Sequence, residues 1–259
     1  MKTITIVSGC YNEADNLDEF FRRVWAVTAG FSQYNWELLV IDNCSTDGTQ
    51  ERLRAAATLE PRLKVIFNIR NFGHIRSPNH GIHQARGDAV IFMASDLQDP
   101  PELIEKFISP WETGTKVVAA IKEQSEESPL FFMVRKAYYR TVARLADVDL
   151  LTNFTGFGLY DREVVDHLRA AEDPYPYLRG QISELGYPVV RVPFVQPLRK
   201  RGFTKNNFYT LFDIAMLGFT NHTKVPLRLA SMVGFSMALF CFGVGVAYFT
   251  YKLEPVPKA

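Results

Sequence analysis

Acidic and amide side chains follow a short apolar run near the middle of the chain. Residues 89–94 read AVIFMA, which is typical of a buried parallel strand. Residues 96–102 read DLQDPPE, and the two prolines end the extended chain and favour the first turn of a helix. Asp96, Gln98 and Asp99 thus place hard oxygen atoms at a strand end, where a divalent cation and a diphosphate can bind. Taken alone, the segment also fits a solvated turn that caps a helix.

Three other polar segments follow earlier apolar runs. They are Cys10-Tyr11-Asn12-Glu13, the turn DNCSTDGT at residues 42–49, and Arg70-Asn71-Phe72-Gly73. The carboxyl ends of parallel strands share one edge of an open α/β sheet, and ligands bind at that edge. There Asp42 can accept a hydrogen bond from the imide of a base, and Glu13 can accept from ribose hydroxyls. Each segment alone could be a cap or a turn, but four in this order indicate one shared site.

The first half of the sequence alternates expected strands and helices. Strands are expected at residues 4–7, 36–41, 63–67, 89–94 and 117–121. Helices are expected at residues 17–27, from 46–47 toward 57, and at 77–85. This alternation predicts an α/β fold with a mostly parallel, Rossmann-like sheet flanked by helices. No GxGxxG motif follows the first strand, so a dinucleotide site is not supported.

Composition narrows the class of protein. The 259 residues suffice for one large domain with an appendage, and the formal net charge of +1 gives no reason to expect nucleic acid as a partner. The three cysteines lie far apart without a CxxC pair, which argues against a disulfide framework or a zinc site.

The last part of the chain predicts a membrane helix. Residues 229–251 contain no charged side chain. As a helix they would extend roughly 34 Å at about 1.5 Å per residue, enough for a hydrocarbon core of about 30 Å. The alternative is a buried core helix of the soluble domain. Residues 129–146 mix basic and aromatic side chains, which fits either an interfacial helix or a solvated charged face, and residues 207–219 are expected to lie along the membrane.

Together these motifs resemble the family 2 glycosyltransferases of GT-A fold. The matching segments are YNE, the D-x-x-S-x-D-G-T turn, RNxG and DLQDPPE, over roughly residues 3 to 230. More narrowly, they resemble the polyprenyl-phosphate glycosyltransferases, a group that includes dolichol-phosphate mannose synthase. Residues 199–205, RKRGFTK, are similar to the R-x-x-G-x-S-K loop of that group.

The resemblance implies roles for individual residues. It assigns Tyr11, Asn12, Glu13, Asp42 and Asn71 to the nucleotide, and Asp96 and Gln98 to Mg²⁺ or Mn²⁺. Asp99 is implied as a further catalytic residue, either as a substitute metal ligand or as an orienting group. The phosphate and acceptor contacts implied are Lys122, Arg135, Arg199, Arg201 and Lys205.

The sequence also departs from the pattern of the group. Ala94 stands where an Asp-x-Asp motif has its first carboxylate, Asn43 replaces a second aspartate after Asp42, and Gly156 replaces an acidic residue. A lipid phosphate, with a second pKa of about 6, is already an anionic nucleophile and needs no general base. The alternatives left open are transfer to a glycan hydroxyl and an inactive, membrane-anchored nucleotide-sugar-binding protein.

The sequence therefore predicts four regions and a function. They are a GT-A domain at 1–205, an interfacial helix at 206–226, a transmembrane helix at 227–252 and a tail at 253–259. The expected reaction is metal-dependent, inverting transfer of a sugar from a UDP- or GDP-linked donor to a polyprenyl phosphate. We expect a membrane protein, with one span or as part of a multi-pass protein, whose catalytic domain faces the cytoplasm. A homo-oligomer is left open.

Overall fold

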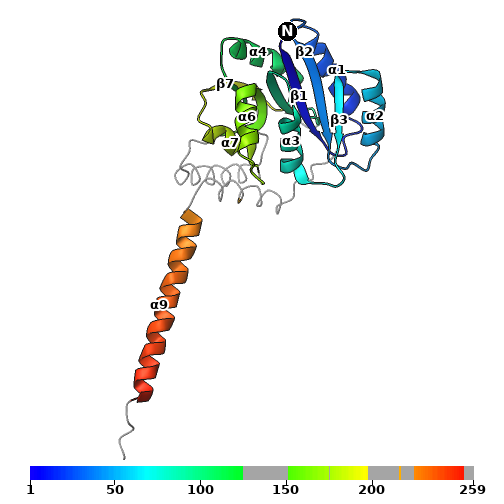
Figure 1. Ribbon diagram of the computed structural model, residues 1–259. Helices are drawn as coiled ribbons and strands as arrows, with labels where there is room; N and C mark the ends of the chain where they lie inside the picture. The colour runs from blue at the N-terminus through cyan, green and yellow to red at the C-terminus, as the bar shows by residue number, and fades with distance from the viewer. Residues whose placement is uncertain (125–150, 175, 198–215, 217–224, 254–259) are drawn as a thin grey trace, which may run out of the picture.

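The computed structural model describes residues 1–124, 151–174, 176–197, 216 and 225–253. In this part of the chain a seven-stranded sheet has the order β3-β2-β1-β4-β6-β5-β7, with helices on both faces (Figure 1). The strands are β1 (Thr3–Cys10), β2 (Asn35–Asp42), β3 (Leu63–Phe67), β4 (Ala89–Ala94), β5 (Val117–Gln124), β6 (Phe154–Asp161) and β7 (Val189–Val195).

Most neighbouring strands run parallel, as the sequence predicts. β1 pairs in parallel with β2 and β4, β2 with β3, and β5 with β7. Among the described strands only β6 is antiparallel, to both β4 and β5. Strands β6 and β7 are not among those expected from the sequence. β7 lies at an edge of the sheet and contains Pro193, a residue that weakens a strand signal but is tolerated at an edge.

The helices of the domain connect these strands. They are α1 (Leu17–Thr28), α2 (Thr49–Leu59), α3 (Gly73–Gln84), the 3₁₀ turn η1 (Pro101–Leu103), α4 (Ile104–Glu112), α6 (Arg162–Ala170) and α7 (Leu178–Glu184). Helix α3 begins four residues before the expected 77–85 and includes Pro78. Gly9 of β1 makes room for this proline, because a Cβ on Gly9 would lie 2.8 Å from Pro78 Cγ.

The core has two parts, one on each face of the sheet. Strand side chains alternate between the faces, so Ile6 packs with Phe20 of α1 and Phe107 of α4, while Val7 packs with Ile82 of α3. The two apolar faces fix the strands in register and leave the polar loops at the carboxyl ends free to form a site.

A long apolar helix, α9 (Val225–Leu253), extends away from the domain (Figure 1). Within the described residues it is the one helix long and apolar enough to cross a membrane, with the span Leu227–Lys252 and a mean hydropathy of 2.0. None of that span is buried, so the alternative of a core helix is wrong. That α9 crosses a membrane stays a prediction, as do the four regional boundaries.

Candidate active site

The carboxyl ends of three adjacent strands bring the predicted site residues together. In the sheet Cys10 of β1 pairs with Asp42 of β2, and Gly9 pairs with Ala94 of β4. The segments that begin at Tyr11, at Asp42 and at Ser95 therefore leave the sheet side by side. The structure thus places three of the four polar segments around one edge, and Asn71 follows β3 next to them.

Asn12 joins the loop after β1 to the loop after β2. Its backbone N–H donates to Ser45 Oγ at 2.8 Å, and its Oδ1 accepts from Thr46 N at 2.8 Å. Its φ of +56° lies in the left-handed region, which asparagine adopts more readily than most residues. Asn12 thereby fixes the relative position of two loops that were predicted to contact a nucleotide.

Glu13 and Asp47 strengthen the same connection. Glu13 is buried, its N–H donates to Thr49 Oγ1 at 2.9 Å, and its Oε2 accepts from Asn16 Nδ2 at 2.6 Å. Asp47 accepts from Ala14 N and from both N and Oγ1 of Thr49. Burial raises the pKa of Asp47, but these hydrogen bonds outweigh it and hold the pKa below its usual range.

Asp42 is fully buried at the end of β2, and half of its carboxylate is satisfied by the protein. Oδ2 accepts from Ser45 N at 3.1 Å and from Gln50 Nε2 at 2.8 Å. Oδ1 is buried and has no hydrogen-bond partner among the described residues. Because an unpaired buried acceptor is costly, this oxygen is suited to a donor on a bound ligand. Gln50 was not predicted, although it directly follows the recognised turn.

Asn43 explains one departure from the family pattern. Its Nδ2 donates to Asn71 Oδ1 at 2.8 Å and to Gly73 O at 3.2 Å, and its Oδ1 accepts from Phe72 N at 2.8 Å. An aspartate has no N–H to donate in this position. The amide at residue 43 therefore ties the loop after β3 to the end of β2, and Asn71 serves that contact.

The acidic turn after β4 presents Asp96 and Gln98 at the same edge. Both side chains are half-buried, and Asp96 Oδ1 accepts from Gln98 N at 3.1 Å. Between them Leu97 has φ +64° and a buried side chain, so the turn anchors itself in the protein while its polar residues remain accessible. Ser95 adds a hydrogen bond from Oγ to Gly9 O at 3.0 Å.

Asp99 lies beneath the turn rather than on its surface. It is 5% exposed, and its Oδ2 accepts from Ala94 N at 2.9 Å. Burial raises its pKa to about 7, and Asp96 adds to the rise, while Ala94 N, Arg179 and Lys122 oppose it. Lys122 is among the residues predicted from the sequence, but Arg179 is not, because it lies in the later helix α7 and outside any recognised motif.

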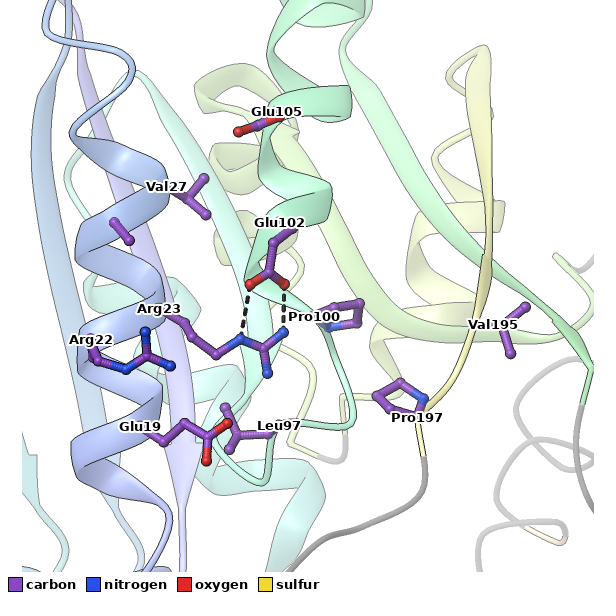
Figure 2. A pocket seen from close by; sticks show the side chains of 11 residues that line it. Glu19, Arg22, Arg23, Val27, Leu97, Pro100, Glu102, Glu105, Val195 and Pro197 are labelled. Carbon is purple, nitrogen blue, oxygen red and sulfur yellow. Dashed lines mark hydrogen bonds and ion pairs between the residues drawn. The ribbon is translucent and has the colours of Figure 1, made fainter.

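An ion pair holds the end of this turn against α1. Arg23 donates from Nε and Nη2 to the two carboxylate oxygens of Glu102, at 2.9 and 2.5 Å (Figure 2). The pair borders a groove of about 590 Å³ between α1, the turn and the end of β7. The groove contains none of the side chains predicted to bind nucleotide or metal, so its size does not mark it as the donor site.

The donors in the turn fit a divalent cation that arrives with a diphosphate. No group of three His, Cys, Asp or Glu side chains within the described ranges forms a preformed metal site. Asp96 and Gln98 supply one carboxylate and one amide oxygen. Mg²⁺ is commonly held by one or two carboxylates together with substrate phosphates and waters, so this donor set is sufficient with a bound substrate.

Four of the predicted phosphate-binding residues lie outside the part of the chain that the structure describes. They are Arg135, Arg199, Arg201 and Lys205, and the expected helices at 129–146 and 207–219 also lie outside it, apart from Met216. Their roles remain predictions. Lys122, by contrast, lies half-buried in β5, and its charge acts on Asp99.

The fold and the arrangement of polar strand ends define a glycosyltransferase of GT-A type. The model of glycosyl transferase family 2 matches residues 5–169, and the chain belongs to this family. It is 33% identical over 245 residues to the uncharacterized glycosyltransferase YkcC of Bacillus subtilis, covering 94% of this chain and 74% of that protein.

Two further relatives have more specific names. The bactoprenol glucosyl transferase of Shigella phage SfV is 28% identical over 243 residues, covering 93% of this chain and 79% of the relative. The undecaprenyl-phosphate 4-deoxy-4-formamido-L-arabinose transferase of Pseudomonas fluorescens is 29% identical over 247 residues, covering 95% of this chain and 71% of the relative.

Solved structures share the fold. Glucosyl-3-phosphoglycerate synthase from Mycobacterium tuberculosis, in complex with Mn²⁺, UDP and phosphoglyceric acid, matches with a TM-score of 0.56 and 18% identity over 83% of this chain and 75% of that one. The mannosyltransferase PcManGT from Pyrobaculum calidifontis, in complex with GDP-Man and Mn²⁺, matches with a TM-score of 0.51 and 17% identity. The match covers 95% of this chain and 80% of that one. At these identities the likeness shows the GT-A fold alone.

Proposed function

We propose that this glycosyltransferase moves a sugar from a nucleoside-diphosphate donor to a polyprenyl phosphate at a membrane surface. The observation that carries the proposal is the meeting of Asp42 and the acidic turn at one sheet edge. There a buried carboxylate oxygen that has no partner among the described residues lies at the same edge as oxygen donors that suit a cation and a diphosphate.

In this proposal, different residues bind the base of the donor and the cation that accompanies its phosphates. Asp42 Oδ1 accepts from an N–H of the base, because that atom is buried and unpaired among the described residues. Asn12 and Glu13 hold the flanking loops in place, and Tyr11 contacts the nucleotide. Asp96 and Gln98 hold a divalent cation, which when bound supplies positive charge that stabilises the departing nucleoside diphosphate.

The acceptor side requires positive charge rather than a base. A phosphate monoester is anionic at neutral pH and attacks the anomeric carbon without losing a proton first. Lys122 is positioned near Asp99 and offers one cation, and Arg135, Arg199, Arg201 and Lys205 are proposed to supply others. A single displacement of this kind inverts the anomeric configuration.

The lipid acceptor is supported by the relatives and by α9. Two relatives are named for bactoprenol and for undecaprenyl phosphate. The exposed apolar span Leu227–Lys252 would hold the domain at the membrane where such a lipid resides. Because nucleotide-sugars are made in the cytosol, we place the domain on that face.

The backbone at Gly156 bears on the missing acidic residue in β6. Gly156 has φ +98°, where other residues are strained. This backbone path accommodates no acidic side chain at residue 156 without strain. Loss of that carboxylate is compatible with an acceptor that is already ionised, whereas a glycan hydroxyl needs a base.

A transfer assay tests the proposal. The full chain in detergent is incubated with Mn²⁺, radiolabelled UDP- or GDP-sugars and a polyprenyl phosphate, and the lipid is extracted. We expect label in the lipid phase that depends on the lipid phosphate. Label that appears only with a soluble glycan acceptor would instead support transfer to a hydroxyl, and no transfer to either would overturn the proposal.

A further inference from the structure

A small cavity opens next to the acidic turn, on the α3 side of the sheet. It measures about 80 Å³ and lies between α3, β4, the start of β6 and the segment that leads into α7. Its polar lining residues are His74, Asn79, Thr155 and Arg179, and Phe92 and Tyr177 add aromatic rings. Since about 10–15 Å³ suffices for one water-sized group, the cavity holds several such groups but not a nucleotide base.

One residue of the cavity lining has a buried acceptor without a partner among the described residues. Asn79 is 4% exposed, and its Oδ1 is buried without a hydrogen-bond partner within the described residues. Its Nδ2 lies 3.2 Å from His83 Nε2. The amide nitrogen of Asn79 is thus the atom that meets the His83 ring, and Oδ1 is the atom without a partner among the described residues.

Arg179 supplies donors to the same cavity. It is half-buried, and in the part of the chain that the structure describes it forms no ion pair. Its guanidinium carbon lies 5.9 Å from the centre of the Tyr177 ring. Its charge acts on His74 of α3 and on Asp99 beneath the acidic turn.

This combination of groups selects a ligand that both donates and accepts. An ionised phosphate presents acceptors alone and would leave Asn79 Oδ1 unpaired. A sugar hydroxyl can donate to Asn79 Oδ1 and accept from the guanidinium, while the aromatic faces of Phe92 and Tyr177 cover the apolar side of the ring. The wall formed by Phe92 belongs to β4, which leads directly into the turn with Asp96.

We propose that this cavity receives the hydroxyl-bearing edge of the transferred sugar, with Asn79 and Arg179 as residues that determine sugar binding. The proposal rests on the proposed function, since it requires a nucleotide-sugar at the adjacent turn. It predicts that the cavity contributes to the binding of the sugar and not to that of the nucleotide.

Binding measurements on the full chain in detergent with Mn²⁺ separate these contributions. The affinity for UDP is compared with that for UDP-glucose, or the affinity for GDP with that for GDP-mannose. The pair is chosen by whichever nucleotide binds the unaltered chain. We expect Arg179→Met to weaken the nucleotide-sugar about 10- to 100-fold, and Asn79→Leu about threefold to tenfold, with less than a twofold change for the nucleotide alone. Arg191→Met, an exposed arginine on β7, is the matched control and should change neither.

The outcomes distinguish the two proposals. If neither UDP nor GDP binds the unaltered chain, the proposed function fails and this inference with it. If the nucleotide binds but the variants change both ligands by the same factor, or change neither, the sugar cavity is wrong. Thr155→Val serves as a second, isosteric variant in case Asn79→Leu does not fold. Like Arg179→Met, it should weaken the binding of the nucleotide-sugar.

Discussion

At the residue scale, one atom of Asp42 separates a binding role from a structural one. The structure uses Oδ2 to hold Ser45 and Gln50 and leaves Oδ1 buried without a partner among the described residues. A purely structural carboxylate at the end of β2 would have both oxygens paired, because an unpaired buried acceptor costs about 1–3 kcal/mol. The unpaired atom is therefore the feature that a nucleotide would satisfy.

Asp42→Asn tests this role. The amide keeps the size of the side chain but removes its charge and places an N–H where one oxygen was. We expect the affinity for UDP or GDP to fall about 10- to 100-fold, the loss of a hydrogen bond to a charged group. Isothermal titration calorimetry measures it. Asp166→Asn on the exposed face of α6 is the control, and an unchanged affinity in Asp42→Asn would remove Asp42 from the site.

The role of Asp96 is tested through the dependence on metal. Asp96 is the one carboxylate that the turn presents at the edge, since Ala94 adds no donor and Asp99 is buried beneath. We expect Asp96→Ala to abolish transfer at all Mn²⁺ concentrations, and Ala94→Asp to lower the Mn²⁺ concentration needed for half-maximal transfer. Glu105→Ala, in the groove beside α1, should behave as the unaltered chain does. Near-normal turnover in Asp96→Ala would contradict the assignment.

At the scale of elements, the site depends on loops that hold one another. The loops after β1 and β2 are joined through Asn12, and the loops after β2 and β3 through Asn43. The turn after β4 is fixed to α1 by Arg23 and Glu102. These contacts join segments that are far apart in sequence, so the packing of the sheet and of α1 sets the relative positions of the loops.

Asn43→Asp tests the joining of two loops. The substitution replaces both N–H donors with an oxygen that faces Asn71 Oδ1 and Gly73 O. We expect the free energy of unfolding to fall by about 1–3 kcal/mol and nucleotide affinity to fall with it. Thermal and chemical denaturation measure the first effect. Exposed Asn35→Asp is the control, and equal stability of the two variants would show that the amide of Asn43 is dispensable.

Asp161 joins elements at the opposite end of the strands from the candidate site, and it predicts that stability depends on pH. It accepts from Trp111 Nε1 of α4 at 2.8 Å, from Lys116 Nζ at 3.0 Å and from Glu163 N of α6 at 3.2 Å. Burial raises its pKa, but these hydrogen bonds prevail and lower it. A lowered pKa stabilises the fold above the pKa of the unfolded chain, about 3.9, and the stabilisation is lost as the pH falls through the folded value.

Asp161→Asn should therefore be destabilised at pH 7 by about 1–3 kcal/mol, with a smaller difference from the unaltered chain below about pH 4. Urea denaturation at several pH values measures this. If the loss of stability in Asp161→Asn stays constant down to pH 3, packing rather than the charge of Asp161 is responsible.

At the scale of the whole molecule, a polar-edged domain is joined to an exposed apolar helix. The candidate span of α9 is not buried by the domain, and apolar side chains cover its whole circumference. Such a surface requires a membrane or a partner, since monomeric soluble proteins rarely expose an apolar patch of this size.

Replacing two apolar residues in the middle of α9 with lysine tests the membrane role. The changes Leu239→Lys and Val244→Lys place charges near the centre of the span, where each charge costs about 2.5–3.5 kcal/mol on insertion scales. We expect the protein to move from the membrane fraction to the soluble fraction or to aggregates. The same change at Thr250 and Tyr251, near the helix end, should leave it in the membrane because long side chains reach the interface there. Equal fractionation of both variants would argue against a span.

The sequence alone determined the fold class, the family resemblance and the apolar helix, because these depend on local patterns. Short apolar runs specify buried parallel strands, polar segments after them mark the ligand edge, and an uncharged run of 23 residues specifies a long apolar helix. The order of the motifs was sufficient to predict that Asp42 and Asp96 share an edge.

Only the tertiary structure decided which of these polar residues are free to act. It showed that Asn12, Glu13 and Asn71 are engaged in contacts between loops and that Asp99 is buried. Within the described residues, it also left one oxygen of Asp42 unpaired. It also brought Arg179 and Asn79, which belong to no recognised motif, to one cavity beside the acidic turn. The reason is physical: hydrogen bonds and charges between residues distant in sequence depend on the packing of the sheet, which local patterns do not encode.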